Sequence, residues 1–135
     1  MHRDVVRFPD GVAVTAVSFD DTGYHRGAQP DYGVYLDARW QPPWPHELVE
    51  WPDFGLPADK AAFATAMSGA LARARAGETV ELGCLGGHGR TGTALAWLAM
   101  LSGISPDEAI GWVRANYCPH AVETAEQHAF VASFR

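Results

Sequence analysis

The spacing of apolar and polar positions divides the chain into a strand-forming first part and a largely helical remainder. Valines lie on both sides of a Pro-Asp-Gly turn signal at residues 9–11 and partly alternate with polar residues, which predicts a β-hairpin over residues 4–19. Residues 20–31 are polar and contain glycines, so they are predicted to form a loop. Short apolar runs predict three further strands, at residues 33–36, 46–51 and 79–82.

Helical spacing of the apolar residues begins at Asp59, and Gly77 ends the first helical pattern. An alanine-rich apolar stretch over residues 91–101 predicts a buried helix. Two capping-box patterns begin the last two helices, at residues 105–108, where a proline takes the first helical position, and at residues 124–127. This order of elements predicts an α/β domain whose central mixed sheet, of about four or five strands, is flanked by helices.

Length and charge narrow the class of protein. The 135 residues, 47% of them hydrophobic, suit one domain over residues 1–135 with a real core. A formal net charge of −6 argues against a nucleic-acid partner. No apolar run approaches the length of a membrane span, so no membrane partner is expected. Lys60 is the only lysine, so an anion site must use arginine, histidine and backbone N–H groups.

Composition also carries expectations about the cellular setting. The two cysteines, in a chain whose N-terminus lacks the apolar stretch of a signal peptide, predict free thiols and a cytoplasmic location. The abundance of alanine, glycine and arginine is typical of a bacterial GC-rich genome. The histidines lack metal-ligand spacing, so no metal is expected. We expect a monomer.

Candidate chemistry is concentrated in residues 83–92, which contain five glycines in ten residues. This density predicts a tight loop defined by its backbone, and a loop that leads into a helix N-terminus forms an anion cradle of N–H groups. Cys84, at the mouth of the cradle, would experience a field that favours the nucleophilic thiolate. Arg90 offers a guanidinium fork for two phosphoryl oxygens, and the Thr91 hydroxyl can donate to the sulfur. The Walker pattern of a nucleotide loop requires a lysine that is absent here.

This pattern, Cys84-x5-Arg90-Thr91-Gly92, resembles the signature loop of the protein tyrosine phosphatase superfamily. The Trp-Pro-Asp-Phe-Gly run at residues 51–55 is similar to the mobile acid loop of that family. Residues 123–127 are similar to the glutamine-loop segment of its tyrosine-specific members. The three motifs occur in the family's order, and together they resemble a small bacterial member of the tyrosine-specific or dual-specificity type.

The resemblance implies a phosphomonoester hydrolase that needs no cofactor and acts through a phosphocysteine intermediate. In that mechanism Cys84 attacks phosphorus, Arg90 binds the phosphoryl oxygens, Asp53 protonates the leaving group and later acts as base, and Thr91 assists departure of the thiolate. The implied phosphate-binding residues are Leu85, Gly86, Gly87, His88, Gly89 and Arg90.

Two positions depart from the family pattern, and a third has two interpretations. Gly83 stands where the family usually has a histidine that supports the thiolate, and His88 can compensate when protonated. Glu123 stands where tyrosine-specific members usually have glutamine. Gln127 and Glu123 are the candidates for positioning the hydrolytic water, but the place of Gln127 in a capping box explains it equally well.

Three functions therefore stay open. The first is a phosphatase acting on a phosphorylated protein, a small phosphorylated metabolite or a phosphoinositide. The second is a catalytically impaired phosphate-binding module of the same fold. The third is a thiol enzyme that handles a sulfur or arsenate oxyanion, for which a Trp-Pro-Asp acid loop has no obvious use. Pocket depth, which depends on residues 20–45, decides among the substrates of the first.

Overall fold

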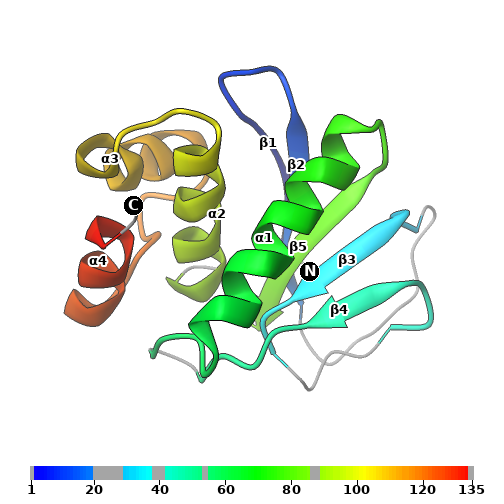
Figure 1. The fold of residues 1–135 in the computed structure, drawn as a ribbon, viewed down its shortest axis with the longest axis horizontal. Helices are drawn as coiled ribbons and strands as arrows, with labels where there is room; N and C mark the ends of the chain where they lie inside the picture. The colour runs from blue at the N-terminus through cyan, green and yellow to red at the C-terminus, as the bar shows by residue number, and fades with distance from the viewer. Residues whose placement is uncertain (1, 20–28, 38–41, 53–54, 86–88, 134–135) are drawn as a thin grey trace.

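One mixed sheet of five strands organises the computed structural model, which describes residues 2–19, 29–37, 42–52, 55–85 and 89–133. The strand order is β1-β2-β5-β3-β4 (Figure 1). The strands are β1 His2–Arg7, β2 Ala13–Phe19, β3 Tyr32–Tyr35, β4 His46–Leu48 and β5 Val80–Leu85. The first two pair antiparallel, and the other three pairings are parallel. The predicted α/β class with a mixed central sheet is confirmed.

The predicted hairpin is confirmed as β1 and β2. Gly11 takes a φ of 90°, in the left-handed region that glycine tolerates best. The turn is closed by two backbone hydrogen bonds, from Gly11 N to Phe8 O (2.9 Å) and from Phe8 N to Val12 O (2.8 Å). The turn signal at residues 9–11 therefore acts locally, as expected.

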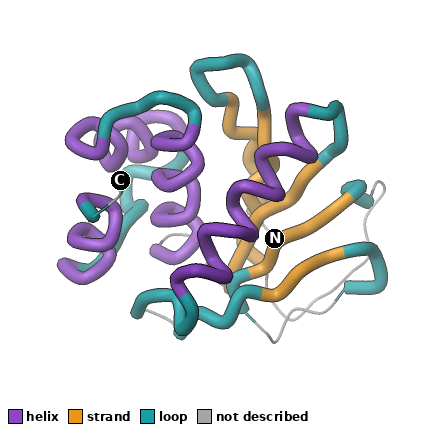
Figure 2. The backbone as a smooth tube through the Cα atoms, in the orientation of Figure 1, coloured by secondary structure: helices purple, strands orange, loops and turns teal. Residues whose placement is uncertain are grey.

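The described residues form four helices: α1 Lys60–Arg75, α2 Gly89–Leu101, α3 Pro106–Asn116 and α4 Ala125–Ala132. Helix α1 crosses in front of β5 and β3, while α2, α3 and α4 gather beside it (Figures 1 and 2). The Asp59 side chain caps α1 by accepting from Ala62 N at 3.0 Å, and Gly77, with a φ of 95°, follows its end. None of the helices in the described ranges is long and apolar enough to cross a membrane.

Aromatic side chains join three helices to the segment before Asp53. Trp51 meets Phe63 of α1 edge-on, with ring centroids 5.2 Å apart, and Trp97 of α2 stacks on Phe130 of α4 at 4.8 Å. Each such pair contributes about 0.5–1.5 kcal/mol beyond the area it buries.

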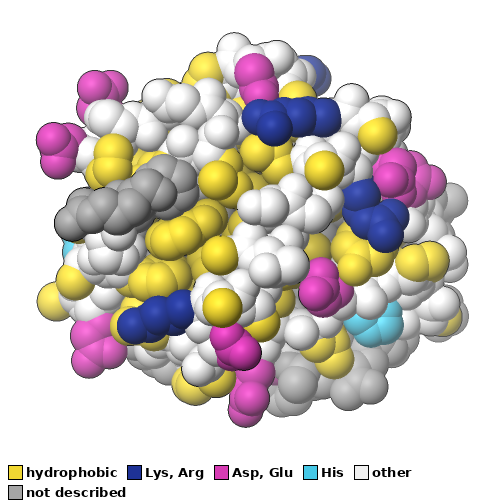
Figure 3. Space-filling view, in the orientation of Figure 1, with side chains coloured by type: hydrophobic (Ala, Val, Ile, Leu, Met, Phe, Trp, Pro, Cys, Tyr) yellow, Lys and Arg dark blue, Asp and Glu magenta, His cyan; other side chains and the backbone are white. Residues whose placement is uncertain are grey.

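On the face shown in Figure 3, acidic and basic side chains are scattered and not sorted by sign. The local chemistry of a site must therefore come from its own residues.

The predicted loop over residues 83–92 is wrong in extent. Gly83 belongs to β5 and Gly89 begins α2, so only residues 86–88 separate the two elements. The glycines allow close approach of neighbouring chain segments: a Cβ on Gly92 would lie 2.5 Å from the Cβ and 2.8 Å from the Cα of Ala121. A high glycine density therefore indicated tight packing and not only a turn.

Two other sequence expectations needed correction, and one was confirmed. The strand predicted at residues 46–51 ends at Leu48. Ser105 stands at the N-cap of α3, but its side chain makes no capping hydrogen bond, so that capping box is absent; Pro106 takes the first helical position as predicted. At α4 both bonds of the predicted capping box between Thr124 and Gln127 are present.

Candidate active site

Cys84 lies near the carboxyl end of β5, the central strand of the sheet. Its side chain is 1% exposed, and strands on both sides hold its backbone, since β5 pairs with β2 and with β3. The fully buried Thr91, in the first turn of α2, donates a hydrogen bond from Oγ1 to the Cys84 Sγ at 2.9 Å. The predicted contact between these two residues is confirmed.

Arg90 is held by three acceptors from other parts of the chain. Its Nη1 donates to the Asp37 Oδ2 (3.2 Å), to the Leu36 carbonyl oxygen (3.2 Å) and to the Trp51 carbonyl oxygen (3.0 Å). The ion pair with Asp37 is buried, with side-chain exposures of 2% for Arg90 and 6% for Asp37. A buried arginine of this kind requires such compensation.

Asp37 is a site residue that the sequence interpretation missed. It lies two residues beyond β3, which is parallel to β5. Carboxyl ends of parallel strands meet at one edge of a sheet, where open α/β sheets place their ligands. Trp51, three residues beyond β4, reaches the same edge. An acidic residue directly after a predicted strand was the available signal.

The residues on both sides of Asp53 are bound to each other. The Trp51 indole Nε1 donates to the Gly55 carbonyl oxygen at 2.7 Å, and Gly55 N donates to the Pro52 carbonyl oxygen at 3.0 Å. Asp53 itself lies outside the described residues, as do Gly86, Gly87 and His88 of the proposed cradle. Of Leu85, only the backbone in β5 is described. Their predicted roles stay predictions.

Gln127 lies beside this segment and is fully buried. Its Oε1 accepts from the backbone nitrogens of Glu123 (2.9 Å) and Thr124 (3.3 Å), and its Nε2 donates to the Gly55 carbonyl oxygen (3.1 Å). The amide therefore connects the start of α4 to the 51–55 segment.

The Glu123 carboxylate lies against the first residue of α2. A Cβ on Gly89 would collide with the Glu123 Oε1 unless that flexible side chain moved aside. A carboxylate at a helix N-terminus is stabilised by the helix dipole, but it also competes with an incoming anion. A hollow of about 460 Å³ adjoins it, lined by Arg114, Pro119, His120, Val122 and Glu123.

The backbone that presents Glu123 is strained. Val122, a buried β-branched residue, has a φ of 63°, which is a rare conformation for such a residue. Arg114 of α3 holds this turn, because its Nε donates to the Ala121 carbonyl oxygen (2.9 Å) and its Nη2 to the Val122 carbonyl oxygen (3.0 Å). Strain of this kind persists only where surrounding contacts enforce it, and it is concentrated at functional sites.

The close approach of β2 explains why residue 83 is a glycine and not the histidine of the pattern that the sequence resembles. A Cβ on Gly83 would lie 2.6 Å from the Val17 carbonyl oxygen and would collide with the Val17 Cγ2. Strand β2 therefore occupies the space that any side chain at residue 83 would need.

Replacement of Gly83 by alanine is expected to lower the free energy of unfolding by about 1–3 kcal/mol, because β2 must move to admit the methyl group. Urea denaturation would measure the change. Gly69→Ala is the matched control, since a Cβ on Gly69, inside α1, meets no atom within 4 Å. That change should raise stability by about 0.5–1 kcal/mol. Equal effects of the two alanines would contradict the close approach of β2 to Gly83.

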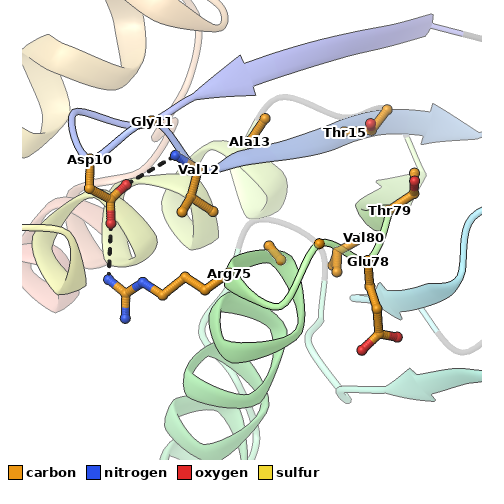
Figure 4. A pocket seen from close by; sticks show the side chains of 11 residues that line it. Asp10, Gly11, Val12, Ala13, Thr15, Arg75, Glu78, Thr79 and Val80 are labelled. Carbon is orange, nitrogen blue, oxygen red and sulfur yellow. Dashed lines mark hydrogen bonds and ion pairs between the residues drawn. The ribbon is translucent and has the colours of Figure 1, made fainter.

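A cavity of about 500 Å³ lies at the opposite edge of the sheet, between the β1–β2 turn and the end of α1 (Figure 4). An ion pair of 3.1 Å between Asp10 and Arg75 spans it, and the hydrogen bond from Arg75 lowers the pKa of Asp10 below its usual value. Thr79 and Val80, also in its lining, mark the amino end of β5, away from Cys84. This cavity is therefore separate from the candidate active site.

Comparison with other sequences finds relatives in an archaeon. No family model matches the chain. An uncharacterized protein of Methanocaldococcus jannaschii is 34% identical over 134 residues, covering 90% of this chain and 80% of the relative. A second uncharacterized protein of that organism is 50% identical over 58 residues, covering 43% of this chain and 38% of the relative. These archaeal relatives do not support the bacterial origin that the composition suggested.

Comparison with solved structures finds phosphatases. A kinase-associated phosphatase whose catalytic-site cysteine is replaced by serine superposes with a TM-score of 0.83, at 17% identity, over 100% of this chain and 94% of its own, which shows the fold. Tk-PTP in its active form has a TM-score of 0.70 at 28% identity, over 93% of this chain and 92% of its own. A glycine-to-alanine mutant form of Tk-PTP gives 0.71 at 25% identity, over 93% and 91%. With a buried cysteine, threonine and arginine at the strand-to-helix junction, this chain belongs to the protein tyrosine phosphatase superfamily.

Proposed function

We propose that this protein is a cysteine-dependent phosphomonoester hydrolase that acts through a phosphocysteine intermediate. The observation that carries the proposal is the 2.9 Å hydrogen bond from the Thr91 Oγ1 to the buried Cys84 Sγ, across the junction between β5 and α2. A structural cysteine does not need a hydroxyl donor from a helix N-terminus. A nucleophile that must also leave benefits from one.

In the first proposed step, the Cys84 thiolate attacks phosphorus. The S–P bond forms, the P–O bond to the leaving group breaks, and Asp53 gives its proton to the leaving oxygen. Backbone N–H groups at the start of α2 and the Nε–Nη2 edge of Arg90 bind the nonbridging oxygens. Meanwhile Nη1 of Arg90 keeps its bonds to Asp37 and to the Trp51 carbonyl.

In the second proposed step, water attacks the phosphocysteine. The new O–P bond forms as the S–P bond breaks, and the electron pair returns to sulfur, where the Thr91 hydroxyl supports it. Asp53, now a carboxylate, takes the proton of the water. The products are inorganic phosphate and the regenerated thiolate. No metal or organic cofactor takes part in this scheme.

The substrate we propose is a phosphorylated protein or a small phosphorylated molecule. If the substrate is a protein, we propose dual specificity, that is, action on phosphotyrosine and on phosphoserine or phosphothreonine. We also propose that the protein acts in the cytoplasm as a monomer, without nucleic-acid or membrane partners. The acidic net charge of −6 supports the absence of nucleic acid.

A second candidate is a phosphate-binding module with impaired catalysis. Gly83 favours it, because the side chain that usually supports the thiolate in this superfamily is absent, which would impair turnover without removing the phosphate cradle. The two functions differ in turnover, not in binding.

The test is release of p-nitrophenol from p-nitrophenyl phosphate by the wild type and by Asp53→Ala. The wild type is expected to turn over, and Asp53→Ala should lower kcat by about 10²-fold and lose the alkaline limb of the pH–rate profile, since that limb reports deprotonation of the acid. Calorimetry with inorganic phosphate runs alongside. Phosphate binding by a wild type that does not turn over would assign the binding module instead.

A further inference from the structure

The Gln127 side chain joins two segments 72 residues apart in the sequence. It is fully buried, and its Nε2 donates to the Gly55 carbonyl oxygen at 3.1 Å. Its Oε1 accepts from Glu123 N and Thr124 N, at 2.9 and 3.3 Å. Both ends of the amide are therefore bound to backbone groups.

The Gly55 carbonyl is a shared acceptor. It also receives the Trp51 indole N–H at 2.7 Å, while Gly55 N donates to the Pro52 carbonyl oxygen at 3.0 Å. The Trp51 carbonyl in turn accepts from Arg90 at 3.0 Å. The described residues on both sides of Asp53 are thus fixed to the start of α4 through Gln127 and to α2 through Arg90.

A water-positioning role would conflict with these bonds. An amide oxygen has two lone pairs, and both acceptor sites of the Gln127 Oε1 are occupied. Turning the amide toward a water would break its bonds to the partly buried nitrogens of Glu123 and Thr124 and its bond to the Gly55 carbonyl, which would keep the Trp51 indole N–H. Each intramolecular hydrogen bond broken in this way costs stability.

Given the phosphatase function proposed above, we propose that Gln127 is a positioning residue for the general-acid step and does not hold the hydrolytic water. It fixes the Gly55 carbonyl, one of the described residues that flank Asp53 in the sequence. The inference rests on the described residues around Asp53, namely Trp51, Pro52 and Gly55.

The two roles predict different kinetics. Protonation of the leaving group belongs to formation of the phosphocysteine, which kcat/KM reports. Protonation matters most for a basic leaving group, such as the phenoxide released from phenyl phosphate. The pKa of the corresponding phenol resembles that of a tyrosine side chain, about 10. Positioning of the water belongs to breakdown of the intermediate. Loss of that positioning would lower kcat equally for every ester and leave kcat/KM unchanged.

Gln127→Glu is the sharpest variant. A glutamate at this capping-box position still accepts from the backbone N–H groups, but its carboxylate has no proton to donate to the Gly55 carbonyl. Gln127→Met, of similar size, removes all the polar contacts and serves as the second variant if the glutamate destabilises the fold. Glu126→Gln, an exposed neighbour on α4, is the matched control. Thermal unfolding of each variant verifies the fold.

We expect kcat/KM for phenyl phosphate to fall about tenfold more than that for p-nitrophenyl phosphate in Gln127→Glu, a part of the 10²–10⁴ that a general acid supplies. In an Asp53→Ala background the same change should have no further effect on kcat/KM. Equal losses for both esters, or a loss in kcat alone, would overturn this inference while leaving the hydrolase intact. An inactive wild type would overturn the hydrolase proposal, and this inference with it.

Discussion

Replacement of Cys84 by serine is expected to abolish turnover of p-nitrophenyl phosphate, by a factor of about 10⁴ or more, as for removal of other enzyme nucleophiles. A serine hydroxyl stays protonated at neutral pH, and the buried site offers no adjacent base in the described residues to activate it. Serine is close to cysteine in size, so Thr91 can still donate to residue 84 and phosphate binding should persist. Single-turnover release of p-nitrophenol and calorimetry with phosphate measure the two quantities.

Cys118 provides the matched control for that experiment. It is the other free cysteine, 7% exposed, and its Sγ accepts from the backbone nitrogen of His120 at 3.4 Å, in the turn that follows α3. Cys118→Ser should leave kcat/KM unchanged. Comparable losses from both serine variants would mean that thiol loss acts through the fold, and substantial turnover by Cys84→Ser would rule out the phosphocysteine.

Replacement of Asp37 by alanine is expected to lower the free energy of unfolding by about 3–5 kcal/mol, because it leaves the charge of Arg90 buried without its carboxylate. The Arg90 and Asp37 side chains are 2% and 6% exposed, so water cannot easily take the place of the carboxylate. Asp37→Asn retains an oxygen acceptor and should cost less. Urea denaturation of both variants gives the free energies.

Two further variants separate the buried charge from other effects. The double variant Asp37→Ala/Arg90→Met should cost less than the sum of the single changes, since neither partner is then left unpaired. Asp10→Ala removes an ion pair of similar length, 3.1 Å, but with exposures of 49% for Arg75 and 32% for Asp10. Its loss should cost at most about 1 kcal/mol. If Asp37→Ala and Asp10→Ala lowered the free energy of unfolding by similar amounts, burial of Arg90 would not be the cause of the loss in Asp37→Ala.

Local signals in the sequence were sufficient for much of the fold. The Pro-Asp-Gly turn predicted the hairpin because a two-strand turn depends on adjacent residues, and Asp59 and Gly77 marked the ends of α1 for the same reason. The extent of β5 was missed. The glycines at residues 83, 89 and 92 predicted a loop. Two of them instead allow close packing of distant residues, Val17 against Gly83 and Ala121 against Gly92. A residue's local pattern does not reveal such distant neighbours.

The contacts of the candidate site also fall into two groups, those that local sequence signals could predict and those that join distant residues. Register within one motif placed Thr91 against Cys84, since seven residues across a strand-to-helix junction form one local unit. The capping box of Gln127 was also local and confirmed. Its bond to Gly55 and the pairing of Arg90 with Asp37 join residues 72 and 53 positions apart. Their prediction would have required the packing of α4 for the first and the strand order for the second.

The central position of β5 has a consequence for oxidative damage. Thiols are oxidised most readily when they are exposed thiolates, and transient opening of a structure can expose a buried one. To release Cys84 from within the sheet, β5 would have to separate from β2 and from β3 at once. Opening of an edge strand such as β4 leaves it covered. We therefore expect peroxide to reach this sulfur from the carboxyl end of β5, the side from which a substrate must approach, and not by way of β2 or β3.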